Sequence, residues 1–97
     1  MGVVMGPWKS ASAALSAEDG LAFVASAPVV LYSVVIANES GTNFAQAGVY
    51  DGPMETGYID FSIPAGGTVV WTGCLALPKG LSVLCETGAV RATVMYV

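Results

Sequence analysis

Short apolar segments that alternate with polar residues and end at glycine or proline turns recur along most of the chain. This feature constrains the fold most. In residues 58–63, for example, Ile59, Phe61 and Ile63 alternate with more polar positions. A period of two places successive side chains on opposite faces of a strand, so that one face is buried and the other is wetter. Helical periodicity is nearly lacking, and the sequence therefore predicts an all-β domain.

Turn residues divide the chain into seven or eight expected strands. The turns with the clearest composition are Asp51–Pro53, Pro64–Gly67 and Pro78–Gly80. We expect strands at Leu21–Ala25, Val29–Asn38, Phe44–Tyr50, Tyr58–Ile63, Thr68–Thr72, Leu81–Glu86 and Val90–Val97, with one more around Trp8–Leu15. Short strands at this spacing favour an antiparallel two-sheet β-sandwich, jelly-roll-like in preference to a closed barrel.

The first 19 residues are rich in alanine and serine and have no firm periodicity. We therefore expect two parts, an extended N-terminal arm at 1–19 and a β-sandwich domain at 20–97. Small side chains bury little surface, so the arm should be mobile in a free subunit. Trp8 and Leu15 are the residues that we expect to bind a neighbouring chain, with Trp8 as an anchor.

The composition predicts contacts with other chains. Hydrophobic residues make up 55% of the 97 positions and charged residues only 10%. A domain of this size buries roughly 60–65% of the surface that its unfolded chain exposes, so surplus apolar side chains need cover from neighbours or from a membrane. The stretch between Asp19 and Glu39 carries no charge, but Pro28 and the β-branched residues around it favour two strands over a membrane span. We expect a homo-oligomer, with a trimer favoured, and no membrane.

The charge balance argues against nucleic-acid binding. The formal net charge is −4, and Lys9, Lys79 and Arg91 are the only basic residues. Three scattered cations cannot neutralise a phosphate backbone. The N-terminus has no basic segment followed by an apolar run, so we expect synthesis in the cytoplasm without a signal peptide.

Histidine does not occur, which removes the commonest general base and the usual activator of a nucleophile. Cys74 and Cys85 fit no metal-binding spacing. They flank the turn at Pro78–Gly80, so a cross-strand disulfide is geometrically possible, but two free, mostly buried thiols are favoured. Glu18 and Asp19 are adjacent and point in opposite directions on an extended chain. We expect no enzyme, no catalytic residue, no cofactor and no bound metal.

Two binding alternatives remain open. Asn38, Glu39, Asn43 and Asp51 could meet at one end of a sandwich and offer oxygen ligands to Ca²⁺, although no known calcium-loop spacing occurs. A sugar-stacking platform could form from Trp8, Phe44, Tyr50, Tyr58, Trp71 and Tyr96. Aromatic residues in strands belong more often to the core.

From Val29 onward the chain resembles small β-sandwich proteins of tailed-bacteriophage virions, of the head-decoration or tail-associated type. The motifs are VVLYSVVIANESG, VYDG, IDFSIPAGGTVVW and LPKGLSVLCETGAVRATVMYV. The resemblance implies a structural or adhesive role and names no catalytic position.

The leading hypothesis is a virion structural protein that decorates or cements the capsid and binds the major capsid protein or another virion protein. Its location would be the capsid surface in preference to the tail. The alternative is a receptor- or carbohydrate-binding module, or an adaptor, of a phage tail. A binding module should gather aromatic and amide groups in one concavity, whereas a cement protein should expose a broad apolar face.

Overall fold

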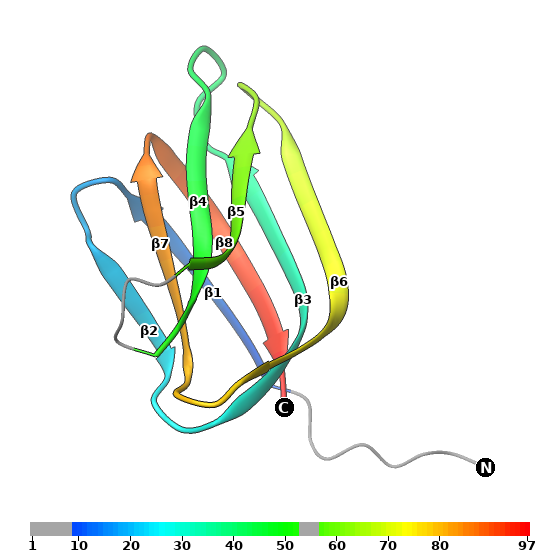
Figure 1. Ribbon diagram of the computed structural model, residues 1–97. Coiled ribbons are helices and arrows are strands. Elements are labelled where there is room, and N and C mark those ends of the chain that lie inside the picture. Colours follow the sequence, from blue (N-terminus) through cyan, green and yellow to red (C-terminus); the bar gives the residue numbers. More distant parts are fainter. Residues whose placement is uncertain (1–8, 53–56) are drawn as a thin grey trace.

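The computed structural model describes residues 9–52 and 57–97, which form eight strands and no helix (Figure 1). The strands are β1 (Lys9–Ser16), β2 (Leu21–Ala25), β3 (Val29–Asn38), β4 (Ala45–Asp51), β5 (Gly57–Ile63), β6 (Thr68–Leu77), β7 (Leu81–Thr87) and β8 (Ala89–Tyr96). The predicted all-β class is confirmed. No helix in the described ranges could cross a membrane, and the uncharged stretch before Glu39 forms β2 and β3.

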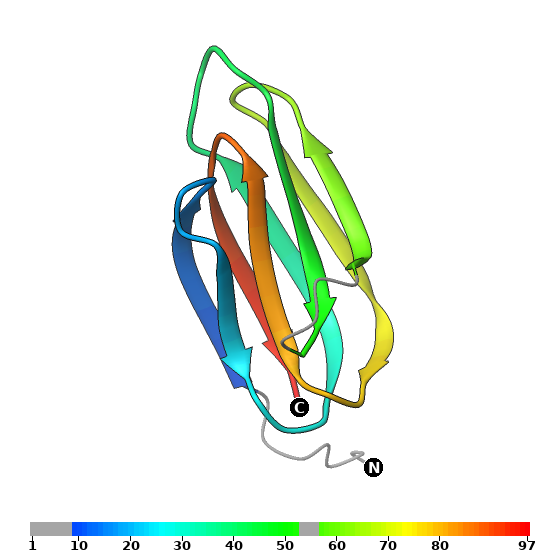
Figure 2. The ribbon, with the colours of Figure 1, turned by 60° about the vertical axis from the view of Figure 1, so that its left-hand side comes forward.

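The strands lie in two antiparallel sheets of four (Figure 2). Sheet A has the order β1-β8-β3-β6, and sheet B has the order β2-β7-β4-β5. The chain pairs its first strand with its last, β2 with β7, β3 with β6 and β4 with β5. The strand pairs are thus nested along the chain, with β4–β5 as the innermost pair and β1–β8 as the outermost. The predicted antiparallel two-sheet sandwich is confirmed.

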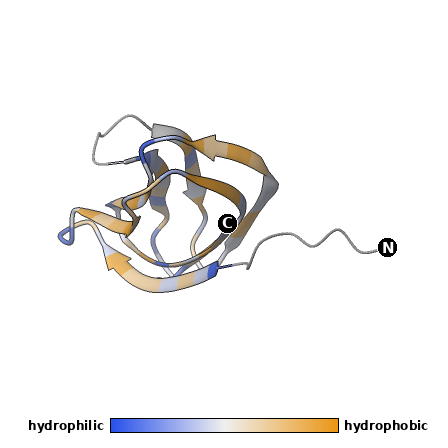
Figure 3. Ribbon diagram, turned by 90° about the horizontal axis from the view of Figure 1, so that it is seen from below, coloured by the Kyte–Doolittle hydropathy of each residue, from blue (hydrophilic) through white to orange (hydrophobic). Residues whose placement is uncertain are grey.

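In each strand, side chains at alternate positions point into the space between the two sheets and fill it. In β8, Val90, Ala92 and Val94 are buried, whereas Arg91 and Met95 point to solvent, as the sequence predicts. The largest fully buried side chains are Leu31, Ile36, Ile63, Leu77 and Leu81. Burying a side chain of this size contributes about 1.5–3 kcal/mol. Hydrophobic residues predominate along the strands of both layers, and hydrophilic ones gather at connecting loops (Figure 3).

The structure differs from the expected division at residue 19, because residues 9–16 of the expected arm are part of the sandwich. β1 pairs with β8 over its whole length, from Lys9 opposite Tyr96 to Ser16 opposite Ala89. Its alanines and serines bury little surface, but the main chain supplies the hydrogen bonds that every strand can make. Composition alone does not show this contribution. Residues 1–8 of the expected arm lie outside the described residues.

The four edge strands differ in regularity. β2, β5 and β6 each pair with their neighbour through a register shift, whereas β1 pairs with β8 without one. In β6 the shift lies opposite Tyr32, where Thr72 pairs with Ser33 and Leu75 with Leu31. The two residues between them, Gly73 and Cys74, bend the strand and let it continue to Leu77. The sequence predicted that this strand ends at Thr72.

Candidate functional site

Of the two residues predicted to bind a neighbouring chain, the structure describes one. Trp8 lies outside the described residues. Leu15 points inward from β1, opposite Val90, and only 8% of its surface is exposed. Its side chain belongs to the core of its own sandwich, so the position differs from the expected partner contact. The reason is the β1–β8 register, which turns alternate residues of β1 toward sheet B.

The expected calcium ligands are not brought together. Asn38 and Asp51 end strands that run to opposite ends of the sandwich (Figure 1). Asp51 Oδ1 accepts a hydrogen bond of 2.9 Å from the backbone N–H of Lys79, which fixes the turn there. Within residues 9–52 and 57–97, no three His, Cys, Asp or Glu side chains gather in a way that could hold a metal ion.

The buried amide of Asn38 organises the loop at its own end. Nδ2 donates to the carbonyl oxygens of Asn43 at 2.8 Å, Ile63 at 3.1 Å and Pro64 at 3.1 Å. Oδ1 accepts a 2.9 Å hydrogen bond from the backbone N–H of Ser40. These bonds tie the 38–43 loop to the end of β5, so the polar groups serve the fold and not a ligand.

The adjacent acids Glu18 and Asp19 form no catalytic pair. Asp19 Oδ2 accepts hydrogen bonds from the backbone N–H of Ser16 at 2.6 Å and from its hydroxyl at 3.2 Å. This arrangement closes the turn between β1 and β2.

A tyrosine lies flat on the outer face of sheet B. Tyr50 is 4% exposed, and its hydroxyl donates a 2.7 Å hydrogen bond to Glu86 Oε1 on the neighbouring strand. Gly48 makes room for the ring, because a Cβ there would lie 3.2 Å from Tyr50 Cε1 and 2.5 Å from Asp60 Oδ1. The sequence placed Tyr50 among possible sugar-stacking residues, but so little of the ring is exposed that it offers no platform.

The other aromatic residues do not gather on one surface. Trp71 faces inward from β6, and its ring lies against Gly73, where a Cβ would be 2.8 Å from Trp71 Cζ2. Tyr96 is buried, whereas Phe44 is 54% exposed beside the 38–43 loop. Trp8 and the side chain of Tyr58 lie outside what the structure describes. The predicted residues that the structure describes therefore do not come together as a sugar platform.

The two cysteines are free, but only one is buried as expected. Cys85 faces the core from β7, and its Sγ donates weakly to the carbonyls of Thr87 and Gly88, both at 3.5 Å. Burial raises the pKa of this thiol, although the hydrogen bond to Thr87 acts in the opposite direction. Cys74 is exposed, because it lies in the β6 bulge. Burial raises the pKa of Tyr32, and Cys74 beside it raises that pKa further.

The outer face of sheet A has few charged residues. Twelve of its outward positions, read from the strand register, are Ser10, Ser12 and Ala14 on β1, Arg91, Thr93 and Met95 on β8, Ser33, Val35 and Ala37 on β3, and Thr68, Val70 and Thr72 on β6. Arg91 is the only charged residue among these positions, and its Nε lies 3.6 Å from Glu39 Oε1. Val70 and Met95 are exposed by 64% and 40%.

The sequence alone does not identify this surface. Alternation gives the face of each residue within one strand, but it does not say which strands are neighbours. The low charge fraction was a signal that such a face exists, but it gave no position.

Comparison with protein families, with curated proteins and with solved structures finds no match to this chain.

Proposed function

We propose that the chain is a non-enzymatic virion structural protein with a jelly-roll fold, which decorates or cements the capsid of a tailed bacteriophage. It is made in the host cytoplasm, docks on the capsid surface and binds the major capsid protein and copies of itself. The observation that carries the proposal is the outer face of sheet A, with one charged residue among the twelve outward positions named above. Depletion of charge is the compositional mark of the centre of a protein interface.

The strand pairing adds support. Nested pairs of eight strands in two sheets are the arrangement of jelly rolls, which occur in viral capsid and lectin domains. A fold by itself does not define a function. The motifs that resemble phage virion proteins, from Val29 onward, favour the capsid among these uses.

The polar loops favour docking over ligand recognition by a tail module. Asn38, Asp19 and Asp51 use their polar atoms in hydrogen bonds to their own backbone. A receptor- or carbohydrate-binding site needs such groups directed toward a ligand.

Binding to capsids of the encoding virus tests the proposal. Val70→Glu introduces a charge at an exposed position on the outer face of sheet A, where the fold tolerates it. Phe23→Glu is the matched control, since Phe23 is exposed to a similar degree, 55%, on the sheet B side. We expect Val70→Glu to weaken capsid binding at least tenfold, because an unpaired charge would be buried, and Phe23→Glu to keep it.

Electron cryomicroscopy of the same particles locates the chain. Density for the sandwich on the shell, with sheet A toward the capsid protein, is the expected result. Equal capsid binding by both variants, or density confined to the tail, would contradict the proposal.

A further inference from the structure

We propose that β1 is an interface between two copies of this chain, in which the β1 strands pair antiparallel about Ala13 and join the two A sheets into one. The inference rests on the proposed function only in taking self-association from it.

The regularity of β1 is the first observation. Edge strands invite pairing with another chain, and proteins usually prevent it with bulges, charges or proline. The three other edges, β2, β5 and β6, each have a register shift. β1 has none, and it contains no proline and only one charged residue, Lys9, at its first position. Asp19 Oδ2 accepts from the N–H of Ser16 at 2.6 Å, so the stretch from Ser10 to Ala14 is the part of this edge best suited to main-chain pairing.

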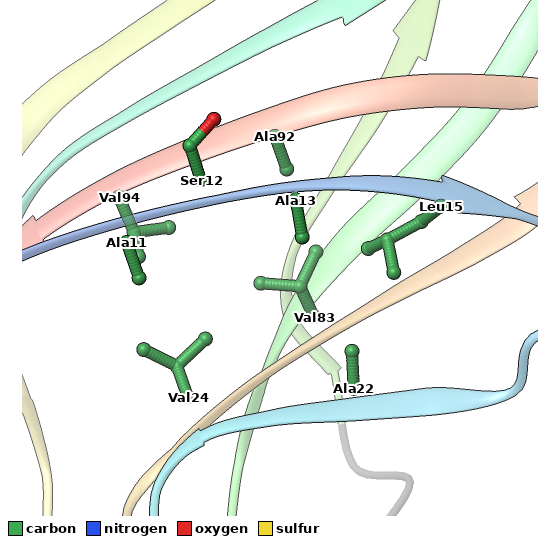
Figure 4. A pocket seen from close by; sticks show the side chains of 9 residues that line it. All are labelled: Ala11, Ser12, Ala13, Leu15, Ala22, Val24, Val83, Ala92 and Val94. Atoms are coloured by element: carbon green, nitrogen blue, oxygen red, sulfur yellow. The ribbon is translucent and has the colours of Figure 1, made fainter.

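A cavity beside β1 is the second observation (Figure 4). It measures about 30 Å³ and lies where β1 and β2 face each other across the two sheets, lined by Ala11, Ala13 and Leu15 of β1, Ala22 and Val24 of β2, and Val83 of β7. Ala13 turns toward this side but remains exposed. An apolar side chain that faces inward and is still exposed indicates that the chain itself does not fully cover this side of the core.

The charges identify the occupant as a second copy in antiparallel orientation. Lys9 begins β1, and Glu18 and Asp19 follow its end. Within one chain, Lys9 and Glu18 are more than about 20 Å apart, because a strand rises about 3.3 Å per residue. Pairing about Ala13 sets Lys9 opposite Ala17 of the second copy, next to that copy's Glu18. Both ends of the contact then join opposite charges, whereas parallel pairing would place Lys9 beside Lys9.

The symmetry of this contact is two-fold, with Ala13 on the axis and Ser10 opposite Ser16. It gives a dimer in place of the trimer expected from the sequence. The dimer doubles the outer face of sheet A, which is poor in charge, because the two A sheets become continuous.

Cross-linking tests the register. In a Cys74→Ser background, Ala13→Cys brings two thiols opposite each other on neighbouring strands, where Cβ atoms are about 4.5–5.5 Å apart. Ser10→Cys is the control on the same strand, since two copies of residue 10 would be about 20 Å apart. We expect mild oxidation to convert most of the Ala13→Cys chain to covalent dimer and at least tenfold less of the Ser10→Cys chain. Equal cross-linking overturns the inference.

Charge reversal tests the orientation through the dimer dissociation constant, measured by sedimentation. Lys9→Glu and Glu18→Lys should each raise this constant about tenfold, because two contacts become repulsive. The double variant should restore it to within about twofold, and Lys79→Glu should leave it unchanged. The inference is overturned if the double variant fails to restore association, or if the dissociation constant is the same in all the variants. Capsid binding lost in Val70→Glu would still stand in that case, so the two proposals fail separately.

Discussion

The sandwich has two open sides, one between β5 and β6 and one between β1 and β2 (Figure 2). Large side chains fill the first, whereas the second is lined mainly by alanine. Phe61, Val69, Trp71 and Leu75 pack against the core on the first side. Ala11, Ala22, Val24 and Ala25 do so on the second. Both edges of the filled side, β5 and β6, pair through a register shift, whereas the alanine-lined side has one such edge, β2, and the regular β1. The first side is filled within the monomer, and the second is the side on which we propose that a second copy binds.

Deleting the edge strand of the alanine-lined side should have the largest effect. Removal of residues 1–16 strips β8 of its β1 partner and uncovers Val90, Ala92 and Val94. We expect this deletion variant to lose its cooperative thermal unfolding transition, which circular dichroism measures. Removal of residues 1–8 leaves β1 in place and should preserve a cooperative transition. Equal behaviour of the two deletions would mean that β1 contributes nothing to the fold.

Truncating the largest side chain of the filled side should cost less. Trp71→Ala should lower the free energy of unfolding by about 3 kcal/mol, because the indole fills space that its neighbours cannot close. Val70→Ala, at the adjacent outward position, should change it by less than about 0.5 kcal/mol. Urea denaturation measures both. Similar changes in the free energy of unfolding for the two variants would show that Trp71 does not fill this side of the sandwich.

Filling the alanine-lined side should stabilise the monomer slightly. Ala22→Val places methyl groups in the cavity of about 30 Å³, which corresponds to about 0.7 kcal/mol at 24 cal/mol per Å³. Ala14→Val makes the same change on the solvent face of β1 and controls for strand propensity. A smaller gain for Ala22→Val than for Ala14→Val would mean that the cavity cannot accept the side chain.

The smallest effect should be the pH dependence due to Cys85. Because the pKa of Cys85 is raised in the folded state, its stabilising effect is complete below the unfolded pKa of about 8.5 and is lost as the pH rises through the folded value. Urea midpoints between pH 7 and pH 10 should fall more for the wild type than for Cys85→Ala. At neutral pH a thiol reagent should label Cys74 at once and Cys85 only when the sandwich opens. Parallel pH profiles would contradict this assignment.

The sequence predicts the strands better than it predicts their neighbours. Alternation and turn residues located seven strands, because burial of one face and reversal of the chain are both local demands. β1 was expected only as one strand within a free arm, because its alanines and serines carry little hydrophobic signal and its stability comes from pairing with a strand 73 residues or more away.

The candidate surfaces were harder to predict than the strands, for the same reason. The contact of Tyr50 with Glu86 and the exposure of Cys74 depend on pairing between distant segments and on one bulge. The outer face of sheet A and the β1 edge exist only after four strands have been placed in order. Composition showed a surplus of apolar residues, but it could not say where they would be exposed.

The central place of β8 in sheet A has a consequence for biosynthesis. β8 lies between β1 and β3, so the sheet has a gap in its middle until residues 89–96 have left the ribosome. Until then β1 lacks its one neighbour and β3 has only β6, and the pairs that close the sheet join distant parts of the chain. Such long-range closure makes folding slow. We therefore expect sheet A to close in a single late step, after β8 has emerged.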